Sequence, residues 1–224
     1  MSRVALLFTL SAMLLSAQDR PLFNGKNLDG WEIRGDGIWT VMKDGTLIGQ
    51  RPHPDSSPVG EFPIPLAKYR AWASPQSWLY TVANDFDQFD LHVEYWIPPG
   101  GNSGISIRDT SRGRWALPGA EHDSARTPSH IGYEIQILDG DTDKFPSGSI
   151  YLFVRAKTGF QHSDDWNSMD IESRHSMIRV RLNGQLVAEG PGDPARSKTG
   201  PIGLQLHDRF SWVMFRNIRI HEVK

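Results

Sequence analysis

Residues 89–96 read Phe-Asp-Leu-His-Val-Glu-Tyr-Trp, and this stretch indicates the fold class. Its first seven residues alternate strictly between apolar and polar, so that an extended strand would present one apolar and one polar face. The same period of two recurs along the chain, and no segment after residue 20 carries a helical apolar repeat of useful length. The pattern predicts an all-β protein of about twelve short strands.

Turn residues separate the expected strands, which are residues 39–42, 46–48, 78–82, 89–96, 103–108, 133–138, 149–155, 177–182, 185–189, 202–207 and 212–220. Asp44-Gly45 and Asn183-Gly184 each lie between two consecutive strands, where such pairs are the strongest short signal for an antiparallel hairpin. Many short strands joined by tight turns favour a sandwich of two antiparallel sheets.

Composition excludes several classes of protein. The chain has 224 residues, of which 38% are hydrophobic and 22% charged, with a net charge of −2. These values do not fit a disordered acidic chain, a collagen-like fibre or a strongly cationic nucleic-acid binder. The sequence has no cysteine, which excludes a disulfide scaffold, a thiolate zinc site, an iron–sulfur cluster and a cysteine nucleophile.

The first 17 residues have the pattern of a signal peptide. Arg3 precedes an apolar run over residues 4–15, and the small residues Ser16 and Ala17 follow. The run is shorter than the ~20 residues of a membrane-spanning helix. We therefore expect no membrane span, and an exported protein, periplasmic or secreted, whose residues 18–224 form a single sandwich domain.

Two segments interrupt the rhythm of strands. Residues 51–76 contain six prolines, which remove backbone donors and predict a long loop inserted into the domain. Residues 109–131 form a second long segment without strand character. Loops of this length in a compact domain are often functional, and each of these contains Trp, Arg and His. We expect both to contribute to the rim of a site.

Three strands carry similar polar groups on the face opposite their apolar residues. The apolar set is Ile105, Ile107, Ile135, Ile137, Leu204 and Leu206. The polar set is Arg108, Glu134, Gln136, Gln205 and His207, to which the strand at 89–96 adds Glu94. Gly104 and Gly203 leave space in this region for another group to approach the sheet. The polar face is either a concave binding surface or an ordinary solvated face of a sheet.

The residue types on this face favour one chemistry over another. Glu134-x-Gln136-x-x-Asp139 resembles the catalytic strand of laminarinase-type glucanases, but residues 134 and 139 would lie on opposite faces of a regular strand. A retaining glycosidase needs two carboxyl groups about 5–5.5 Å apart. A single carboxylate with Arg108, Gln136 and His207 is better suited to removing a proton next to a carbonyl group.

Cofactor motifs are absent from the sequence. It has no Gly-x-Gly-x-x-Gly after a strand and no phosphate-binding loop, so we expect no nucleotide or redox cofactor. A divalent cation remains an open alternative, since Glu134, Asp139, His207 and Asp208 are all of ligand type. Asp141 and Asp143 form a small acidic turn that could bind calcium or be merely solvated.

Seven short motifs, in order, resemble those of a known family. They are residues 23–31 (FNGKNLDGW), 101–108 (GNSGISIR), 132–139 (GYEIQILD), 165–167 (DWN), 182–184 (LNG), 200–207 (GPIGLQLH) and 215–218 (FRNI). Over about residues 21–223 the chain is similar to the 3-keto-disaccharide hydrolase family, also described as 3-keto-glucoside lyase/hydratase domains. The segment 51–76 is longer than this resemblance leads us to expect.

The resemblance implies a concanavalin A-like jelly-roll sandwich in an exported protein that acts on glycosides already oxidised at C3 of the sugar. Elimination after removal of the C2 proton, followed by hydration, would give net hydrolysis of such a mono- or disaccharide derivative. We expect Glu134 or His207 to be the base or acid, with Arg108 as a further catalytic residue. The expected substrate-binding residues are Asn102, Gln136, Asp139, Gln205 and Glu94. The alternatives are a non-catalytic carbohydrate-binding module on the same face and a structural partner domain.

Overall fold

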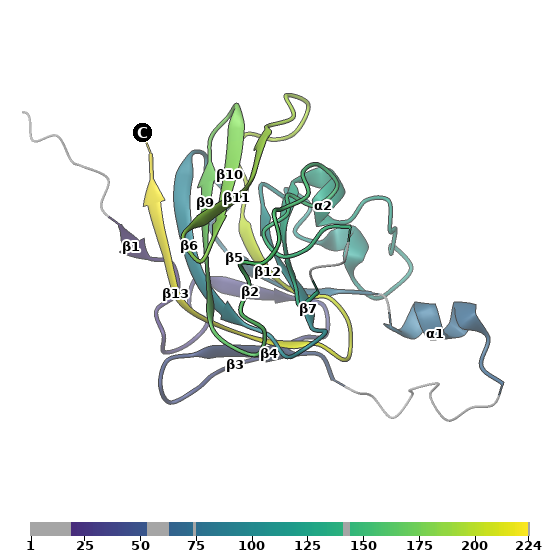
Figure 1. Ribbon diagram of the computed structural model, residues 1–224. Coiled ribbons are helices and arrows are strands. Elements are labelled where there is room, and N and C mark those ends of the chain that lie inside the picture. The colour runs from purple at the N-terminus through teal and green to yellow at the C-terminus, as the bar shows by residue number, and fades with distance from the viewer. Residues whose placement is uncertain (1–18, 53–62, 74, 141–143, 224) are drawn as a thin grey trace, which may run out of the picture.

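The computed structural model describes residues 19–52, 63–73, 75–140 and 144–223, which form an all-β sandwich (Figure 1). The expected signal peptide, residues 1–17, and the acidic turn, residues 141–143, lie outside the described residues. Two antiparallel sheets enclose the core, which confirms the predicted fold class.

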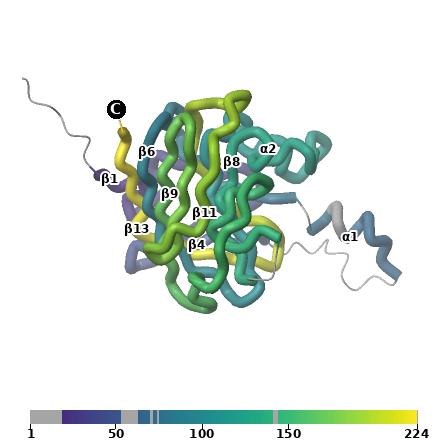
Figure 2. Tube along the Cα trace, turned by 45° about the horizontal axis from the view of Figure 1, so that its top comes forward, coloured from purple at the N-terminus to yellow at the C-terminus, as the bar shows by residue number. Residues whose placement is uncertain are grey.

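The larger sheet has eight strands. They are β1 (Arg20–Pro21), β3 (Ile38–Val41), β4 (Leu47–Gln50), β6 (Phe89–Trp96), β9 (Asn167–Ser173), β10 (Met177–Leu182), β11 (Gln185–Pro191) and β13 (Trp212–Glu222). Their order is β11-β10-β9-β6-β13-β4-β3, with β1 also paired to β13, and every pair is antiparallel. Figure 2 shows β11, β9, β6 and β13 crossing one face of the molecule.

The smaller sheet has five strands and carries the predicted polar face. They are β2 (Trp31–Arg34), β5 (Ser77–Thr81), β7 (Asn102–Ile107), β8 (Tyr133–Leu138) and β12 (Ile202–Leu206), in the antiparallel order β2-β5-β12-β7-β8. The three strands that supply the polar set, β12, β7 and β8, are therefore adjacent.

The apolar side of these three strands faces the core as predicted. The six side chains of the apolar set are all at most 1% exposed. They pack between the sheets with residues of the larger sheet such as Leu91, Met169 and Phe215. Because side chains alternate along a strand, Glu134, Gln136 and Gln205 then point away from the core, towards the outer face of the smaller sheet.

Helices are short and lie in the two long segments. They are α1 (Leu66–Ala73), α2 (Pro128–Ile131) and a 3₁₀ turn at Arg114–Ala116. The expectation of an uninterrupted loop over residues 51–76 is thus wrong for its second half. Residues 66–73 are the stretch between Pro65 and Pro75 that can form helical hydrogen bonds, and Tyr69 donates its backbone N–H to the Pro65 carbonyl. In Figure 1, α1 stands apart from the sheets.

One predicted strand is absent and three strands were missed. Residues 149–155 form a turn, in which Leu152 has a φ of 70° and Phe153 and Val154 donate their backbone N–H groups to the Ile150 carbonyl. Strands β1, β2 and β9 were not predicted. In β9 only Met169 and Ile171 are aliphatic, so its apolar signal is weak.

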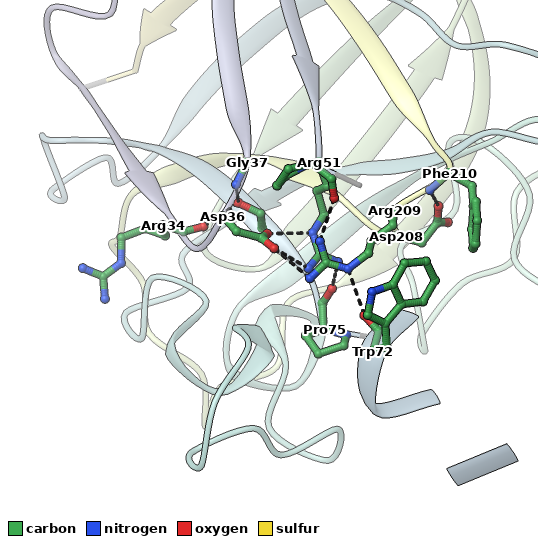
Figure 3. A network of polar contacts seen from close by, with 11 residues as sticks. Arg34, Asp36, Gly37, Arg51, Trp72, Pro75, Asp208, Arg209 and Phe210 are labelled. Carbon is green, nitrogen blue, oxygen red and sulfur yellow. Dashed lines mark hydrogen bonds and ion pairs between the residues drawn. The ribbon is translucent and has the colours of Figure 1, made fainter. Parts of the chain in front are cut away.

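Two arginines and one carboxylate hold the ends of the 51–76 segment; we call Asp36, Arg51 and Arg209 the arginine clamp (Figure 3). Asp36 accepts hydrogen bonds from Arg51 at 2.8 and 3.0 Å, and Arg209 lies 2.9 Å from the same carboxylate. Arg51 also donates to the Pro75 carbonyl, while Arg209 donates to the carbonyls of Pro52 and Trp72. The clamp fixes where the insertion leaves and rejoins the sandwich.

Candidate functional site

A cavity of about 400 Å³ lies on the outer face of the smaller sheet; we call it the site cavity. It is lined by Gln76, Asn102, Ser124, Thr127, Ser129, His130, Glu134, Gln136, Tyr151, Leu152 and His207. Four of the predicted site residues, Asn102, Glu134, Gln136 and His207, therefore meet in one place. The predicted polar face therefore borders a cavity and is not an open, solvated face of the sheet.

Glu134 is the buried acid of this cavity. Its side chain is 4% exposed, and its Oε1 atom accepts a hydrogen bond of 2.9 Å from Nε2 of Gln205. Burial raises the pKa of Glu134 to about 7, although the nearby His207 and the bond from Gln205 act to lower it. A carboxylic acid with this pKa can both accept and return a proton at neutral pH.

Two glycines make space on this face, but the protein's own side chains occupy that space. A Cβ atom on Gly104 would lie 2.8 Å from Oε1 of Glu134 and 3.3 Å from Oε1 of Gln205. A Cβ atom on Gly203 would clash with the ring of Tyr80. Gly104 thus allows the carboxylate to lie close against the sheet.

His207 follows the last residue of β12 and faces the same cavity. Its Nδ1 atom lies 3.2 Å from a carboxylate oxygen of Asp208. Burial acts to raise the pKa of Asp208, but the bonds from His207 and from the backbone of Phe210 and Ser211 outweigh it and lower the pKa to about 2. Asp208 is therefore an anion that orients the imidazole ring and leaves Nε2 for other partners.

The segment 109–131 covers one side of the cavity, as expected of a functional rim. Asp109 is fully buried and accepts hydrogen bonds from the hydroxyl of Tyr80, from the backbone and hydroxyl of Ser111, and from the backbone of Gly113. These bonds fix the start of the segment on the smaller sheet. Figure 2 shows its later part, which includes α2, beside β8.

The rim supplies residues that the sequence reasoning did not single out. Nδ1 of His130 lies 2.9 Å from the hydroxyl of Thr127, and burial together with the charge of Arg196 lowers the pKa of His130. Tyr151 reaches the cavity from the turn that had been expected to be a strand. The segment 109–131 lines the cavity as expected, whereas Gln76 is the one described residue of 51–76 that does so, and no periodicity indicates which loop side chains point inwards.

Gln205, a predicted substrate-binding residue, does not line the cavity but supports Glu134. It is fully buried, and it holds the Glu134 carboxylate from below through its amide nitrogen. Asn102 and Gln136 do line the cavity, with 3.5 Å between Oδ1 of Asn102 and Nε2 of Gln136. Their amides remain available for hydroxyl or carbonyl oxygens of a ligand.

Arg108 does not belong to the site cavity, contrary to the prediction. Its φ of 60° breaks the alternation at the end of β7. The side chain is 1% exposed, and its guanidinium group donates to the carbonyls of Asp87 and Arg174, at the ends of two strands of the larger sheet. Arg108 therefore joins the two sheets and does not face a ligand.

Asp139 and Glu94 are likewise placed away from the cavity. Asp139 lies beyond β8 and accepts hydrogen bonds from the backbone of Gly100 and from Gln161 and Ser163. Glu94 is on β6 of the larger sheet, where it accepts bonds from Arg216 and Asn217. Neither lines the cavity with Glu134: Asp139 holds a loop together, and Glu94 belongs to the other sheet.

Within the described ranges, no three His, Asp or Glu side chains come together as a metal site would require. No helix of those ranges is both long enough and apolar enough to cross a membrane.

A larger cavity, of about 550 Å³, lies elsewhere, between β1, the turn of the β3–β4 hairpin and β13. Its polar walls bond within the protein: Asn24 accepts backbone bonds from Lys26 and Asn27, and Asp44 accepts one from Thr46. It lacks a buried acid, so we assign the function to the smaller site cavity.

Comparisons with known proteins agree with this architecture. Residues 18–221 match the family model described as a 3-keto-alpha-glucoside-1,2-lyase-like domain, whereas no curated protein matches the chain. A structure from Parabacteroides distasonis, provisionally described as a glycosyl hydrolase, is 21% identical with a TM-score of 0.64, over 92% of this chain and 100% of that one. A carbohydrate-binding module from Bacillus subtilis is 15% identical with a TM-score of 0.56, over 86% and 96%. The structural likenesses show the sandwich fold of the concanavalin A-like type.

Proposed function

Because the chain belongs to the family of 3-keto-alpha-glucoside-1,2-lyase-like domains, we propose that it cleaves glycosides whose sugar carries a keto group at C3. The observation that carries this proposal is the buried Glu134, with a pKa of about 7, in one cavity with His207. The 3-keto group makes the neighbouring C2 proton acidic, and a buried carboxylate is a suitable base for it.

The proposed reaction is elimination followed by hydration. The Glu134 carboxylate takes the C2 proton, and the electrons of the C–H bond form an enediolate with the C3 oxygen. The enediolate re-forms the C3 ketone and a C1–C2 double bond while the C1–O bond breaks, and the leaving group departs with its electron pair and gains a proton. Water then adds across the double bond, with hydroxide at C1 and a proton at C2, which gives net hydrolysis.

The residues of the cavity divide this work. Glu134 is the base, and His207, oriented by Asp208, is the acid that protonates the departing oxygen. The amides of Asn102 and Gln136 hold the sugar and can donate to the developing enediolate oxygen. Arg108 is not assigned this role, because its guanidinium group bonds to the Asp87 carbonyl away from the cavity. Among the described residues Glu134 is the one carboxylate that lines the cavity, and this fits elimination better than hydrolysis by a pair of carboxylates at a glycosidase spacing.

Replacement of Glu134 tests the assignment of the base. Glu134→Gln keeps the shape of the side chain, and we expect kcat/KM on a 3-keto-glucoside to fall at least about a hundredfold, the contribution of a positioned base. His207→Ala should be comparably harmful. Glu94→Gln, on the other sheet, is the control and should keep the wild-type value. Wild-type rates in both cavity variants would place the chemistry elsewhere, with the 109–131 rim the next segment to examine.

Deuterated water tests the route itself. Elimination and hydration remove a proton from C2 and return one from solvent, so the product should carry deuterium at C2 above the level of an enzyme-free control. Cleavage without this label would support direct hydrolysis. The same assay run with a chelator reports whether a divalent cation takes part.

A non-catalytic carbohydrate-binding module is the alternative from another class, because the fold is shared with such a module from Bacillus subtilis. Calorimetry and product analysis on the same 3-keto-glucoside separate the two. Binding without any product over long incubation would favour the module.

Export is a further part of the proposal and rests on the pattern of residues 1–17. We expect protein from the envelope or medium of its host to begin near Gln18. Mass spectrometry that finds Met1 on the exported protein would contradict this.

A further inference from the structure

A second compartment adjoins the site cavity. It has a volume of about 290 Å³ and shares Asn102, Gln136, Tyr151 and Leu152 with the first. The two spaces are therefore neighbouring halves of one trough along β7 and β8, separated at the level of these four side chains. A ligand held at Glu134 has the second compartment as its neighbour.

The walls of the second compartment differ in chemistry from those of the first. Its own lining residues are Leu138, Lys144 and Phe145, and among the described residues no carboxylate or histidine lines it. The rings of Phe145 and Tyr151 lie 5.0 Å apart at an angle of 55°. Lys144 places its ammonium group 5.5 Å from the centre of the Phe145 ring. The described walls thus offer a flat apolar surface with a cationic donor and two amides, whereas the first compartment offers the acid–base groups Glu134 and His207.

Leu152 lies at the boundary between the two halves in an unusual conformation. Its φ is 70°, a region that bulky side chains rarely adopt, and its side chain is 43% exposed. The turn that holds it is fixed by the bond from the Tyr151 backbone to the Glu134 carbonyl and by the bonds to Ile150. The same backbone bond ties the aromatic wall to the strand that carries the acid.

We infer that the second compartment binds the leaving group of the glycoside, and that it selects leaving groups containing a six-membered ring. This rests on the proposed function, since it requires the 3-keto sugar to occupy the site cavity. The C1–O bond that breaks then spans the boundary at Asn102, Gln136, Tyr151 and Leu152. The departing oxygen then lies at this boundary, open to the acid of the site cavity, while the ring that it carries extends into the second compartment and the sugar remains beside Glu134.

Size and chemistry both favour a ring over a small alkyl group. A cavity of about 150 Å³ already holds a benzene molecule, so 290 Å³ accommodates one ring with its solvent. Aromatic side chains present a flat apolar surface to a phenyl ring or to the C–H face of a sugar. Lys144, Asn102 and Gln136 can donate to ring hydroxyl groups.

The test compares three 3-keto-glucosides that differ in the leaving group: methanol, phenol and glucose. For each variant we take the ratio of kcat/KM for the ring-bearing substrate to kcat/KM for the methyl glycoside. A loss of activity that affects all substrates equally leaves this ratio unchanged. In Phe145→Ala this ratio should fall about tenfold or more, the effect of removing an apolar group from a binding pocket. Phe153→Ala is the matched control, because Phe153 lies in the neighbouring turn but lines neither cavity.

Each outcome is decisive. A fall of the ratio for phenol and glucose alike supports selection for any ring, and a fall for phenol alone supports an aromatic aglycone. Equal losses on all three substrates, or an unchanged ratio, overturn the inference while leaving the proposed function standing. No turnover of any of the three by the wild-type protein overturns the proposed function and the inference with it. Thermal unfolding of each variant identifies a folding defect. If Phe145→Ala does not fold, Phe145→Leu takes its place in the same comparison.

Discussion

Glu134 is a residue whose ionisation works against the fold. Burial raises its pKa to about 7 from the ordinary 4.5, so the native state holds a proton that the unfolded chain has already released. Between these pH values the native state binds more protons, and stability must therefore fall as pH rises through this window. Below pH 4.5 the penalty is absent, and above pH 7 it is complete.

Glu134→Gln should therefore stabilise the protein while it removes activity. At pH 8 we expect a gain of up to about 3 kcal/mol, from roughly 1.4 kcal/mol per pH unit of the raised pKa, and no gain at pH 4. Urea unfolding at pH 4, 6 and 8 measures it. Glu94→Gln is the control: burial raises the pKa of Glu94, but bonds from Asn217 and Arg216 lower it overall, so no gain at pH 8 is expected. A variant less stable than wild type at pH 8 would contradict the buried-acid description.

Gly104 and Gly203 are equivalent in the sequence but not in the structure. Alanine at 104 would press on the ends of two side chains, Glu134 and Gln205, whereas alanine at 203 would press on the rigid ring of Tyr80. We expect Gly104→Ala to lower kcat/KM at least about tenfold by displacing the base, an effect of misplacement. Gly203→Ala should instead cost about 1–3 kcal/mol of stability, the usual range for overpacking. Steady-state kinetics and thermal unfolding of both variants separate the two; identical behaviour would contradict the assignment.

Arg108 shows where prediction from sequence ends at this scale. Strand alternation correctly placed Glu134, Gln136 and the six core residues, because a regular strand leaves each side chain only two directions. Arg108 and Asp139 lie just beyond strand ends, where the period no longer applies. Tyr151 comes from a turn and His130 from the four-residue helix α2, where side-chain directions depend on tertiary bonds that no local pattern encodes.

At the scale of elements, strands with a clear period and a hairpin turn were predictable. β8 and β10 have the expected bounds, and the β3–β4 and β10–β11 hairpins form around Asp44-Gly45 and Asn183-Gly184. Residues 149–155 carry as much apolar character as a strand but fold as a turn. The hydroxyl group and the backbone N–H of Ser149 both donate to the Pro146 carbonyl. Such local hydrogen bonds compete with the ladder of a strand and favour the turn.

The strand β8 carries the acid on one side and the core on the other, so its packing is testable. Ile135 is fully buried between the sheets, and Ile135→Ala should cost about 2–5 kcal/mol, the usual range for emptying a packed aliphatic site. Ile33 on β2 is 43% exposed and is the matched control, for which a change within about 0.5 kcal/mol is expected. Chemical denaturation of both variants measures the difference. Equal effects would mean that the two faces are not distinguished as described.

At the scale of the molecule, three of the connections between the sheets meet in the arginine clamp. Asp36 lies between β2 and β3, and Arg209 between β12 and β13, two links that each pass from the smaller to the larger sheet. Arg51 follows β4 and reaches the Pro75 carbonyl just before β5. The clamp therefore joins both sheets to the insertion. Arg209 also directly follows Asp208, so the clamp lies next in the chain to the residue that orients His207.

Asp36→Asn tests whether the clamp supports the whole sandwich. Burial acts to raise the pKa of Asp36, but the bonds and charges of Arg51 and Arg209 outweigh it and lower the pKa below 3.8. A lowered pKa contributes stability above the ordinary value, which is lost as pH falls through the folded value. At pH 7 we expect a cost of roughly 1–3 kcal/mol, less than for a fully buried pair because Asp36 is partly screened by solvent.

The pH dependence distinguishes this charge effect from a simple packing defect. The difference between Asp36→Asn and wild type should be full above about pH 5 and should shrink below pH 3.8, where the carboxylate of the wild type takes up a proton. Glu222→Gln, which removes the exposed ion pair with Arg20, is the control and should cost at most about 1 kcal/mol. Thermal unfolding between pH 3 and 7 measures all three proteins. A cost that does not change with pH would mean that Asp36 acts through packing, and no cost would mean that Arg51 and Arg209 hold the insertion without it.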